Sequence, residues 1–299
     1  MMQGSKFIWL DNKLVDWEKA KVHPMTHSLH YGDAVFEGVR FYKTEKGTAI
    51  FRLKEHVDRL FHSASAFDMK VPLSNREAFN AIKEAVKANG IEEGYIRPFL
   101  FFGEKMGLNN IDLEAHFSVI VIPWGSYLGE NAVRVKTSKF IRIHPSSSLM
   151  TAKISGHYAN SILASADAKK AGFDEALLLD YKGNIAEGPG ENFFIIKDGK
   201  LITPKPGTIL PGITRDSIFK IAKDEGIETV ETDLTLNDAY GADEAFFTGT
   251  AAEVTLIESL DNKKIGDGKG KIGEKLKQIY KSAVRGKDKR YLGWLELVK

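Results

Sequence analysis

The stretch between residues 175 and 203 constrains the fold most, because it places four short apolar segments between tight-turn residues. These segments are 175–180, 184–187, 192–196 and 201–203, and they are separated by Lys182-Gly183, Gly188-Pro189-Gly190 and Asp198-Gly199. Glycine and proline at such intervals are typical of hairpin connections. The pattern therefore predicts an antiparallel, hairpin-rich sheet in this part of the chain.

The first 122 residues combine helical and strand patterns. Residues 54–68 place Val57 and Leu60 on one helical stripe, and Ser74 with Glu77 forms a capping box at the start of a second helix. Strand patterns occupy 7–15, as a short hairpin, and also 95–102 and 116–122. A further strand is predicted over 133–143, and helices are predicted over 159–171 and 272–284. Another helix is predicted to open within 209–215 and to run to Glu225.

Composition limits the classes of function. With 299 residues and 43% hydrophobic content, the chain is long enough for two domains with a real core. The 42 basic and 40 acidic residues are interspersed, so we expect neither a nucleic acid nor a membrane surface as a partner. The absence of cysteine excludes disulfides and thiolate catalysis, and no apolar stretch has the length of a signal peptide or a membrane span. We expect a soluble, cytoplasmic protein.

Residues 123–130 interrupt the strand pattern with glycines and two large aromatic residues, Trp124 and Tyr127. Glycine-rich segments between patterned regions are typical of connections, and aromatic residues in such a segment often face a ligand. We therefore expect a domain over residues 1–122, a connection over 123–130 and a second domain over 131–299.

Lys153 stands among small and apolar residues just before a helical pattern begins. A lysine in such surroundings loses its proton more easily than a solvated one, and the neutral amine can attack a carbonyl to form a Schiff base. The alternative is an ordinary surface lysine on a loop. The sequence around Lys153 does not by itself decide between the two.

Three further charged side chains have both a functional and a structural interpretation. Glu187 ends a strand beside a glycine-proline turn, where a carboxylate can point at a ligand or simply face solvent. Arg59 lies on the 54–68 helix and is either solvated or a ligand of an anion. Arg97 shares a strand face with Tyr95 near a very apolar run, and needs an anionic partner, either a ligand or an internal salt bridge.

Two turns offer backbone amides to an anion. Gly212, Ile213 and Thr214 open a helix, where unpaired N–H groups and the helix dipole favour a phosphate. The segment 246–252 ends a strand in a second turn rich in amides and hydroxyls. Together they favour a phosphorylated ligand.

Other motifs are weaker. His23, His27 and His30 have helical spacing, but Pro24 interrupts it and no carboxylate stands at a familiar ligand interval, so we expect no metal site. Residues 268–273 match GxGxxG formally but follow a polar turn instead of the first strand of a βαβ unit.

Seven motifs occur in a fixed order along the whole chain: HSLHYGDAVFEGVR, YIRP, PWGSYLG, the Lys153 segment with GHYANS, EGPGENFF, LPGITRDS and FTGTAAEV. In this set the chain resembles the branched-chain amino acid aminotransferases, which are pyridoxal phosphate enzymes of fold type IV. The resemblance implies a two-domain α+β fold, with a smaller N-terminal α/β domain and a larger C-terminal domain built around a barrel-like sheet. It also implies a homodimer or a higher homo-oligomer.

The resemblance implies that Lys153 holds pyridoxal 5'-phosphate and moves the proton during the reaction. Glu187 then matches the partner of the pyridine nitrogen, and Tyr158 the phenol beside the 3'-oxygen. The remaining cofactor positions are the phosphate cradle of Arg59, Ile213, Thr214, Gly249 and Thr250, and the ring contacts Gly190 and Leu210. Such a cofactor is an electron sink, and it needs a carbonyl-reactive amine, a base and a group that keeps its ring nitrogen protonated.

The implied substrates are L-leucine, L-isoleucine and L-valine, with glutamate and 2-oxoglutarate as the other pair, in a ping-pong transfer. The apolar pocket matches Tyr31, Phe36, Gly38, Trp124 and Tyr127, while Tyr95, Thr250 and Ala251 would hold the α-carboxylate. Arg97, together with Tyr31 from a neighbouring subunit, would meet the side-chain carboxylate of glutamate by charge-assisted hydrogen bonds.

Two other functions stay open at this point. Other fold-type IV enzymes, namely D-amino acid and (R)-amine transaminases and aminodeoxychorismate lyases, keep the lysine, the glutamate and the phosphate cradle. Tyr31, Tyr95, Arg97 and the 124–127 loop favour the branched-chain class over them. A non-catalytic protein could instead use the two amide-rich turns for a nucleotide, but it would have no need of Lys153.

The chain departs from the family pattern in two places. Ile154, Ser155 and His157 follow the lysine where small residues are common, and Thr255-Leu256-Ile257 follows the last motif where a Thr-Pro pair is common. Neither change removes a catalytic group, but both bear on substrate preference.

Overall fold

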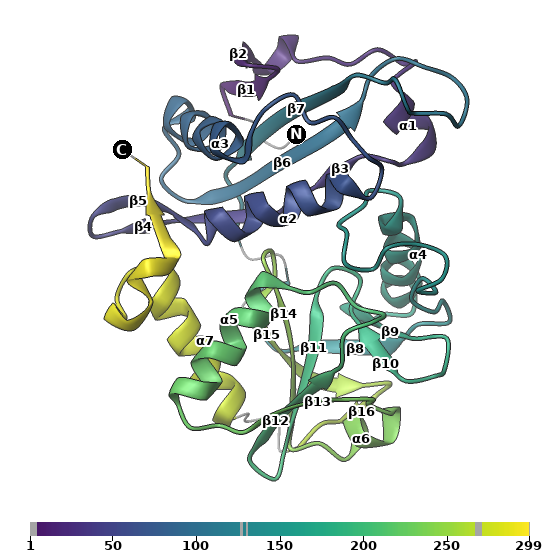
Figure 1. Cartoon of the computed structure of the whole chain (residues 1–299). Helices are drawn as coiled ribbons and strands as arrows, with labels where there is room; N and C mark the ends of the chain where they lie inside the picture. Colours follow the sequence, from purple (N-terminus) through teal and green to yellow (C-terminus); the bar gives the residue numbers. More distant parts are fainter. Residues whose placement is uncertain (1–4, 126–127, 130, 267–270, 299) are drawn as a thin grey trace. The chain divides into compact units, whose positions relative to one another are not determined.

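A computed structural model of the chain describes residues 5–125, 128–129, 131–266 and 271–298 (Figure 1). The chain forms two compact units. The first unit comprises Met1–Gly125, Ala152–His157 and Ala283–Lys299, and the second comprises Ser126–Thr151 and Tyr158–Ser282. The short Ala152–His157 segment, which carries Lys153, thus belongs to the first unit although its sequence neighbours belong to the second. The domain boundaries at residues 122 and 130 stay a prediction.

The first unit is built on one antiparallel sheet with the strand order β17-β5-β4-β6-β7-β1-β2, and with β3 paired to β6. The strands are β1 (Phe7–Leu10), β2 (Lys13–Asp16), β3 (Val35–Phe36), β4 (Val39–Thr44), β5 (Gly47–Phe51), β6 (Gly94–Phe102), β7 (Ala115–Ile122) and β17 (Leu295–Leu297). The long β6–β7 pair runs in register from Tyr95↔Ile122 to Phe102↔Ala115, and it forms the centre of the sheet.

Helices α2 (Leu53–Ser65) and α3 (Asn75–Asn89) lie beside this sheet (Figure 1). Both helices share one hydrophobic core with it. Leu60 and Ile82, from the apolar stripes of the two helices, are fully buried there. The predicted capping box at Ser74 and Glu77 is present and starts α3. The short helix α1 (His27–Tyr31) and the 3-10 turns η1 (Trp17–Lys19) and η2 (Lys289–Trp294) complete the first unit.

The second unit contains a closed six-stranded barrel. Its strands are β8 (Val133–Thr137), β9 (Glu175–Leu179), β10 (Ile185–Glu187), β11 (Asn192–Lys197), β14 (Glu244–Gly249) and β15 (Glu253–Leu260). The order β10-β9-β8-β15-β14-β11 closes because Glu187 of β10 also pairs with Asn192 of β11. Closure removes the exposed sheet edges, and it fixes the carboxylate at the end of β10 beside β11.

Further elements extend from this barrel. Strands β12 (Lys200–Pro204) and β13 (Thr229–Thr232) continue from β11, and β16 (Lys263–Lys264) pairs with β15. The helices are α4 (His157–Lys170), α5 (Ile213–Asp224), α6 (Leu236–Tyr240) and α7 (Lys271–Val284). The predicted hairpins between residues 175 and 203 are confirmed, since β9, β10, β11 and β12 pair antiparallel in sequence.

One strand prediction needs correction. The strand expected over 133–143 ends at Thr137, because the Ser138 hydroxyl accepts a hydrogen bond from the Phe140 amide and turns the chain away from the ladder. Strand β17 was not predicted. Its three residues pair antiparallel with β5, and this pairing brings the end of the chain to the edge of the first sheet. In the part of the chain that the structure describes, no helix combines the length and apolarity needed to cross a membrane.

Candidate active site

Lys153 is held in the first unit by backbone pairing with the segment 32–36. The Ser155 amide donates to the Ala34 carbonyl at 2.8 Å, and the Phe36 amide donates to the Lys153 carbonyl at 3.1 Å. Val35 and Ile154 form the antiparallel bridge between these bonds. The Lys153 ammonium lies over the Phe36 ring, 5.1 Å from its centre. Lys153 therefore occupies a defined place in the fold and is not a lysine on a free surface loop.

Two glycines permit this close pairing. The Gly156 amide donates to the Gly32 carbonyl at 2.8 Å, and Gly32 has a φ of +70°. A Cβ on Gly32 would lie 3.0 Å from the Gly156 Cα, and one on Gly156 would lie 3.0 Å from the Gly32 oxygen. Any larger side chain at either position would push the two backbones apart.

Ser63 links Lys153 to helix α2. Its buried hydroxyl accepts a hydrogen bond from the Lys153 amide at 2.9 Å and donates to the Arg59 carbonyl at 2.8 Å. The helix that presents Arg59 therefore also supports the backbone of the lysine. Sequence patterns pointed to Lys153 and Arg59 but gave no role to Ser63.

Glu37 is the buried partner of Arg59. Its carboxylate accepts hydrogen bonds from Arg59 Nε at 2.6 Å, Arg59 Nη2 at 2.9 Å and His56 Nδ1 at 2.7 Å. Burial alone would raise the pKa of Glu37, but the charge of Arg59 and the bonds from both partners hold this pKa well below its ordinary value. Burial lowers the pKa of His56, and the nearby charges of Arg59 and Lys153 lower it further against the opposing effect of Glu37.

Phe36, Gly38, Tyr95, Arg97 and Trp124 come together in the first unit. The Arg97 guanidinium lies over the Phe36 ring at 4.4 Å and donates to the Tyr95 hydroxyl at 2.9 Å. The rings of Tyr95 and Trp124 are 5.0 Å apart. The shared strand face of Tyr95 and Arg97 is thus confirmed.

Arg97 forms no ion pair with any described residue, so the alternative of an internal salt bridge finds no support in that part of the chain. Its Nε atom is buried and has no hydrogen-bond partner in that part of the chain. A partly buried guanidinium that lacks a counter-charge is suited to an anionic ligand. The apolar surroundings and the arginine fit a pocket that accepts both aliphatic and acidic side chains.

Tyr31 does not belong to the group of residues around Arg97. Its hydroxyl accepts a hydrogen bond from the Gly107 amide at 3.0 Å, and its ring lies against His27 and His30. His27 itself bonds Asp33 and the Gly107 carbonyl, which is a structural role. Tyr31 therefore does not join Arg97 within one chain. Tyr127 lies outside the described residues.

In the second unit, Glu187 is buried at the end of β10. Its carboxylate accepts hydrogen bonds from Arg142 Nε at 2.7 Å, Asn192 Nδ2 at 3.1 Å and the Leu210 amide at 3.2 Å. The adjacent guanidinium favours the ionised form of this carboxylate. The alternative of a solvated turn residue is wrong for Glu187, which is 4% exposed.

The contacts of Asn192 bring several of the predicted cofactor positions close to Glu187. Its amide nitrogen also donates to the Leu210 carbonyl at 2.9 Å, and a Cβ on Gly212 would overlap its side-chain oxygen. On the other side, a Cβ on Gly249 would lie 3.1 Å from the Gly190 carbonyl. The loops that carry Gly190, Leu210 and Gly249 therefore meet beside the carboxylate.

Both predicted anion turns are present in the second unit. Helix α5 starts at Ile213 with Gly212 as its N-cap, so no side chain caps its first turn. Thr214 is buried in that turn, and the turn from Gly249 to Ala252 joins β14 to β15. The buried Thr248 hydroxyl lacks a partner within the described residues. This set of amides and hydroxyls fits the phosphate of a pyridoxal phosphate cofactor.

The predicted site residues are thus divided between the units. The first unit holds Tyr31, Phe36, Gly38, Arg59, Tyr95, Arg97, Trp124 and Lys153, and the second holds Tyr158, Glu187, Gly190, Leu210, Ile213, Thr214, Gly249, Thr250 and Ala251. Tyr158 lies in the first turn of α4. Sequence patterns missed five supporting residues, namely Glu37, His56, Ser63, Arg142 and Asn192. Only Glu37 and Asn192 stand inside motifs that could have drawn attention to them.

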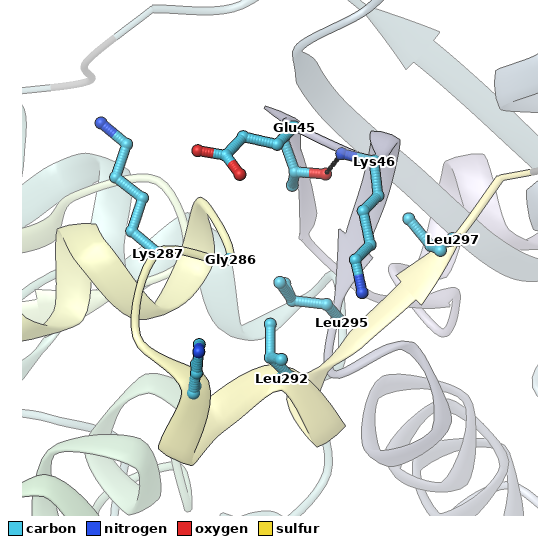
Figure 2. Close-up of a pocket in the computed structure, with 9 residues that line it drawn as sticks. Glu45, Lys46, Gly286, Lys287, Leu292, Leu295 and Leu297 are labelled. Carbon is cyan, nitrogen blue, oxygen red and sulfur yellow. Dashed lines mark hydrogen bonds between the residues drawn. The ribbon is translucent and has the colours of Figure 1, made fainter.

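A separate cavity of about 360 Å³ lies in the first unit, between the β4–β5 turn and the C-terminal segment (Figure 2). Its lining includes Lys46, Lys287 and Lys289 together with the apolar side chains of Leu292 and Leu295. None of its lining residues belongs to the predicted site.

Comparison with known proteins identifies the family. Residues 34–260 match the family described as amino-transferase class IV. A branched-chain-amino-acid aminotransferase of Pseudomonas aeruginosa is 48% identical over 298 residues, which cover 98% of this chain and 97% of that protein. The chain belongs to the branched-chain amino acid aminotransferases of class IV.

Solved structures of this family agree with the fold and with the cofactor. The branched-chain aminotransferase of Thermoproteus uzoniensis, solved with norvaline, is 41% identical, with a TM-score of 0.96 and with 99% of this chain and 100% of that chain covered. The PLP-form of the Thermobaculum terrenum enzyme is 34% identical, with a TM-score of 0.94 and 99% of both chains covered. The predicted α+β fold with a C-terminal barrel, the aminotransferase class and the pyridoxal phosphate cofactor are confirmed.

The packing at Gly38 gives a test of the Tyr95 and Arg97 arrangement. A Cβ on Gly38 would overlap the Tyr95 hydroxyl, so Gly38→Ala must displace this ring and its bond with Arg97. We expect KM for L-leucine to rise roughly tenfold or more, since a hydrogen bond to a charged group is worth about 1.5–3 kcal/mol. Gly293→Ala is the control, because a Cβ there meets no atom within 4 Å. An unchanged KM would contradict the placement of Tyr95 in the substrate pocket.

Proposed function

We propose that this branched-chain amino acid aminotransferase carries its pyridoxal phosphate on Lys153 and transfers the amino group between branched-chain L-amino acids and 2-oxoglutarate. The observation that carries the proposal is the position of Lys153, whose amide and carbonyl are both bonded within the first unit. An amine that must meet one carbonyl atom in a defined direction needs such a fixed backbone.

The cofactor phosphate would be held by Arg59, by the first-turn amides of Ile213 and Thr214, and by the turn at Gly249 and Thr250. Helix dipole and backbone donors favour the dianion at α5, and the guanidinium adds a forked, charge-assisted contact. Gly190 and Leu210 would contact the ring, and the Tyr158 phenol would interact with its 3'-oxygen. The hydrogen bonds from Asn192 hold the Leu210 loop in place for this contact.

When bound, pyridoxal phosphate supplies an electron sink for the charge that develops at the substrate Cα as its proton leaves. Glu187 holds the proton on the ring nitrogen, and Arg142 and Asn192 orient its carboxylate. Lys153 Nζ would take the proton from the substrate Cα and deliver it to C4′ of the cofactor in one half-reaction, and it would move a proton from C4′ to Cα in the other. These roles need a carboxylate that stays ionised and an amine with a fixed backbone.

On the substrate side, Tyr95 and the turn amides of Thr250 and Ala251 hold the α-carboxylate. Phe36 and Trp124 would contact the aliphatic side chain, and Gly38 leaves room for the Tyr95 ring. Arg97 serves the second substrate, because its cationic group can pair with the side-chain carboxylate of glutamate while its stem remains in an apolar pocket. A solved branched-chain amino acid aminotransferase that is 43% identical to this chain is complexed with N-(5'-phosphopyridoxyl)-L-glutamate, which supports an acidic substrate in a site of this kind.

The first unit also carries an apolar surface that supports self-association. Its exposed side chains are Val22, Met25, Leu29, Tyr31, Met106, Leu108 and Ile111, with Leu108 84% and Ile111 71% exposed. They lie on two adjacent segments, since the Lys105 amide donates to the Met25 carbonyl and the His27 amide to the Gly103 carbonyl. We propose that a second copy of the chain covers this surface and that Tyr31 thereby reaches the partner's substrate pocket. A cytoplasmic location stays a prediction.

Lys153→Ala tests the proposed function. We expect transamination between L-leucine and 2-oxoglutarate to fall by a factor on the order of 10⁴, because the variant lacks the group that moves the Cα proton. Initial rates and thermal unfolding should be measured together with Lys87→Ala, which removes an exposed lysine of α3 in the same unit. Retained turnover in the Lys153 variant would contradict the assignment. Wild-type turnover of D-alanine or an (R)-amine in place of L-leucine would move the chain to another fold-type IV activity.

Acidic substitutions in this apolar surface test whether the chain self-associates through it. In the double variant Leu29→Glu and Leu108→Glu, two exposed apolar side chains become acidic, and we expect the mass measured by light scattering to fall to that of one chain. Desolvating two new charges at a contact costs more than the contact gains. Asn237→Glu adds an acidic residue at an exposed position of α6 and should leave the mass unchanged. A wild-type protein of monomer mass, or a double variant of unchanged mass, would overturn the proposed surface.

A further inference from the structure

We infer that Glu37 is a positioning residue for the cofactor phosphate, because it fixes the direction in which the Arg59 guanidinium presents its donors. This inference rests on the proposed function, in which Arg59 is a phosphate ligand. Glu37 itself is given no contact with substrate or cofactor.

The geometry of the pair supports this role. Glu37 bonds Arg59 through Nε and Nη2, so both of its oxygens lie along one edge of the planar guanidinium. A bidentate pair of this kind has only one low-energy orientation, and the remaining edge of the guanidinium then faces a fixed direction. A single contact to one nitrogen would leave the group free to rotate.

Burial of the ion pair holds the Arg59 guanidinium in this orientation. The Glu37 side chain is 1% exposed, that of Arg59 is 11% exposed, and His56, which bonds the second Glu37 oxygen, is 1% exposed. Water therefore cannot replace the carboxylate, and moving either charge out of the pair carries a large desolvation cost. The Glu37 backbone is anchored as well, because its amide donates to the Pro98 carbonyl at 2.8 Å.

The position of Glu37 in the chain also fits. Glu37 follows Phe36, whose amide binds the Lys153 carbonyl, and Ser63 connects Lys153 to the Arg59 carbonyl. The carboxylate therefore closes a loop of contacts that ties the lysine and the phosphate ligand to one framework. A wrongly oriented Arg59 side chain would leave these backbone contacts intact, and it would weaken the binding of the phosphate.

Glu37→Gln tests the inference. The amide has nearly the same shape, but its nitrogen is a donor that must face a donor of Arg59 or His56. We expect the affinity of the full-length protein for pyridoxal phosphate to fall roughly 10- to 100-fold, in line with a charge-assisted bond. The affinity for pyridoxal, which has no phosphate, should change by less than about threefold. The readout is the ratio of the affinity for pyridoxal phosphate to the affinity for pyridoxal, both measured by absorbance titration.

Further variants make the result specific. Asp33→Asn changes another buried carboxylate of the first unit, one that bonds His27 rather than an arginine, and should leave the ratio unchanged. Arg59→Gln should lower the ratio by itself. The double variant with Glu37→Gln should show no further decrease, because both substitutions act through the Arg59 guanidinium. If Glu37→Gln does not fold, Glu37→Asp keeps the charge but shortens the reach, and it should lower the ratio in the same direction.

The outcomes separate this inference from the proposed function. A wild-type protein that binds pyridoxal as tightly as pyridoxal phosphate would show that the phosphate site itself is wrong. A wild-type preference for the phosphate that persists in Glu37→Gln or Glu37→Asp would overturn the role of Glu37 alone. An additive loss in the double variant would also overturn it, since Glu37 would then act independently of Arg59.

Discussion

The arrangement depends first on the backbone pairing between the Lys153 segment and residues 32–36. Three hydrogen bonds and the Val35–Ile154 bridge integrate a six-residue segment into a unit from which its sequence neighbours are absent. Gly32 and Gly156 permit the approach, because no side chain fits between the two backbones there. The reactive amine is therefore positioned by main-chain geometry, and it does not depend on the flexibility of a surface loop.

Each unit then supports one site residue by a buried ion pair. Glu37 pairs with Arg59 in the first unit, and Arg142 pairs with Glu187 in the second. Buried pairs contribute little net stability, because desolvation offsets most of the attraction between the charges. What they do provide is a defined orientation and a defined charge, which a phosphate ligand and a ring-nitrogen partner both require.

Sequence patterns predicted the local parts of this site well. Lys153 and Glu187 were found because small residues and turns surround them, and the Ser74 capping box because its spacing is a local signature. Arg142 could not be found, since it lies in an irregular segment 45 residues from its partner and was expected to continue a strand. The choice between a ligand and an internal salt bridge for Arg97 could not be made from the sequence, because no spacing rule reveals that its guanidinium lies over Phe36.

The position of the cofactor on the chain is the most direct test of this account. The full-length protein would be loaded with pyridoxal 5'-phosphate, reduced with borohydride, digested and mapped by mass spectrometry. We expect one phosphopyridoxyl group, on the peptide that contains Lys153. A modified peptide from elsewhere in the chain, or no modified peptide at all, would contradict the central claim that the pairing with residues 32–36 exists to position this lysine.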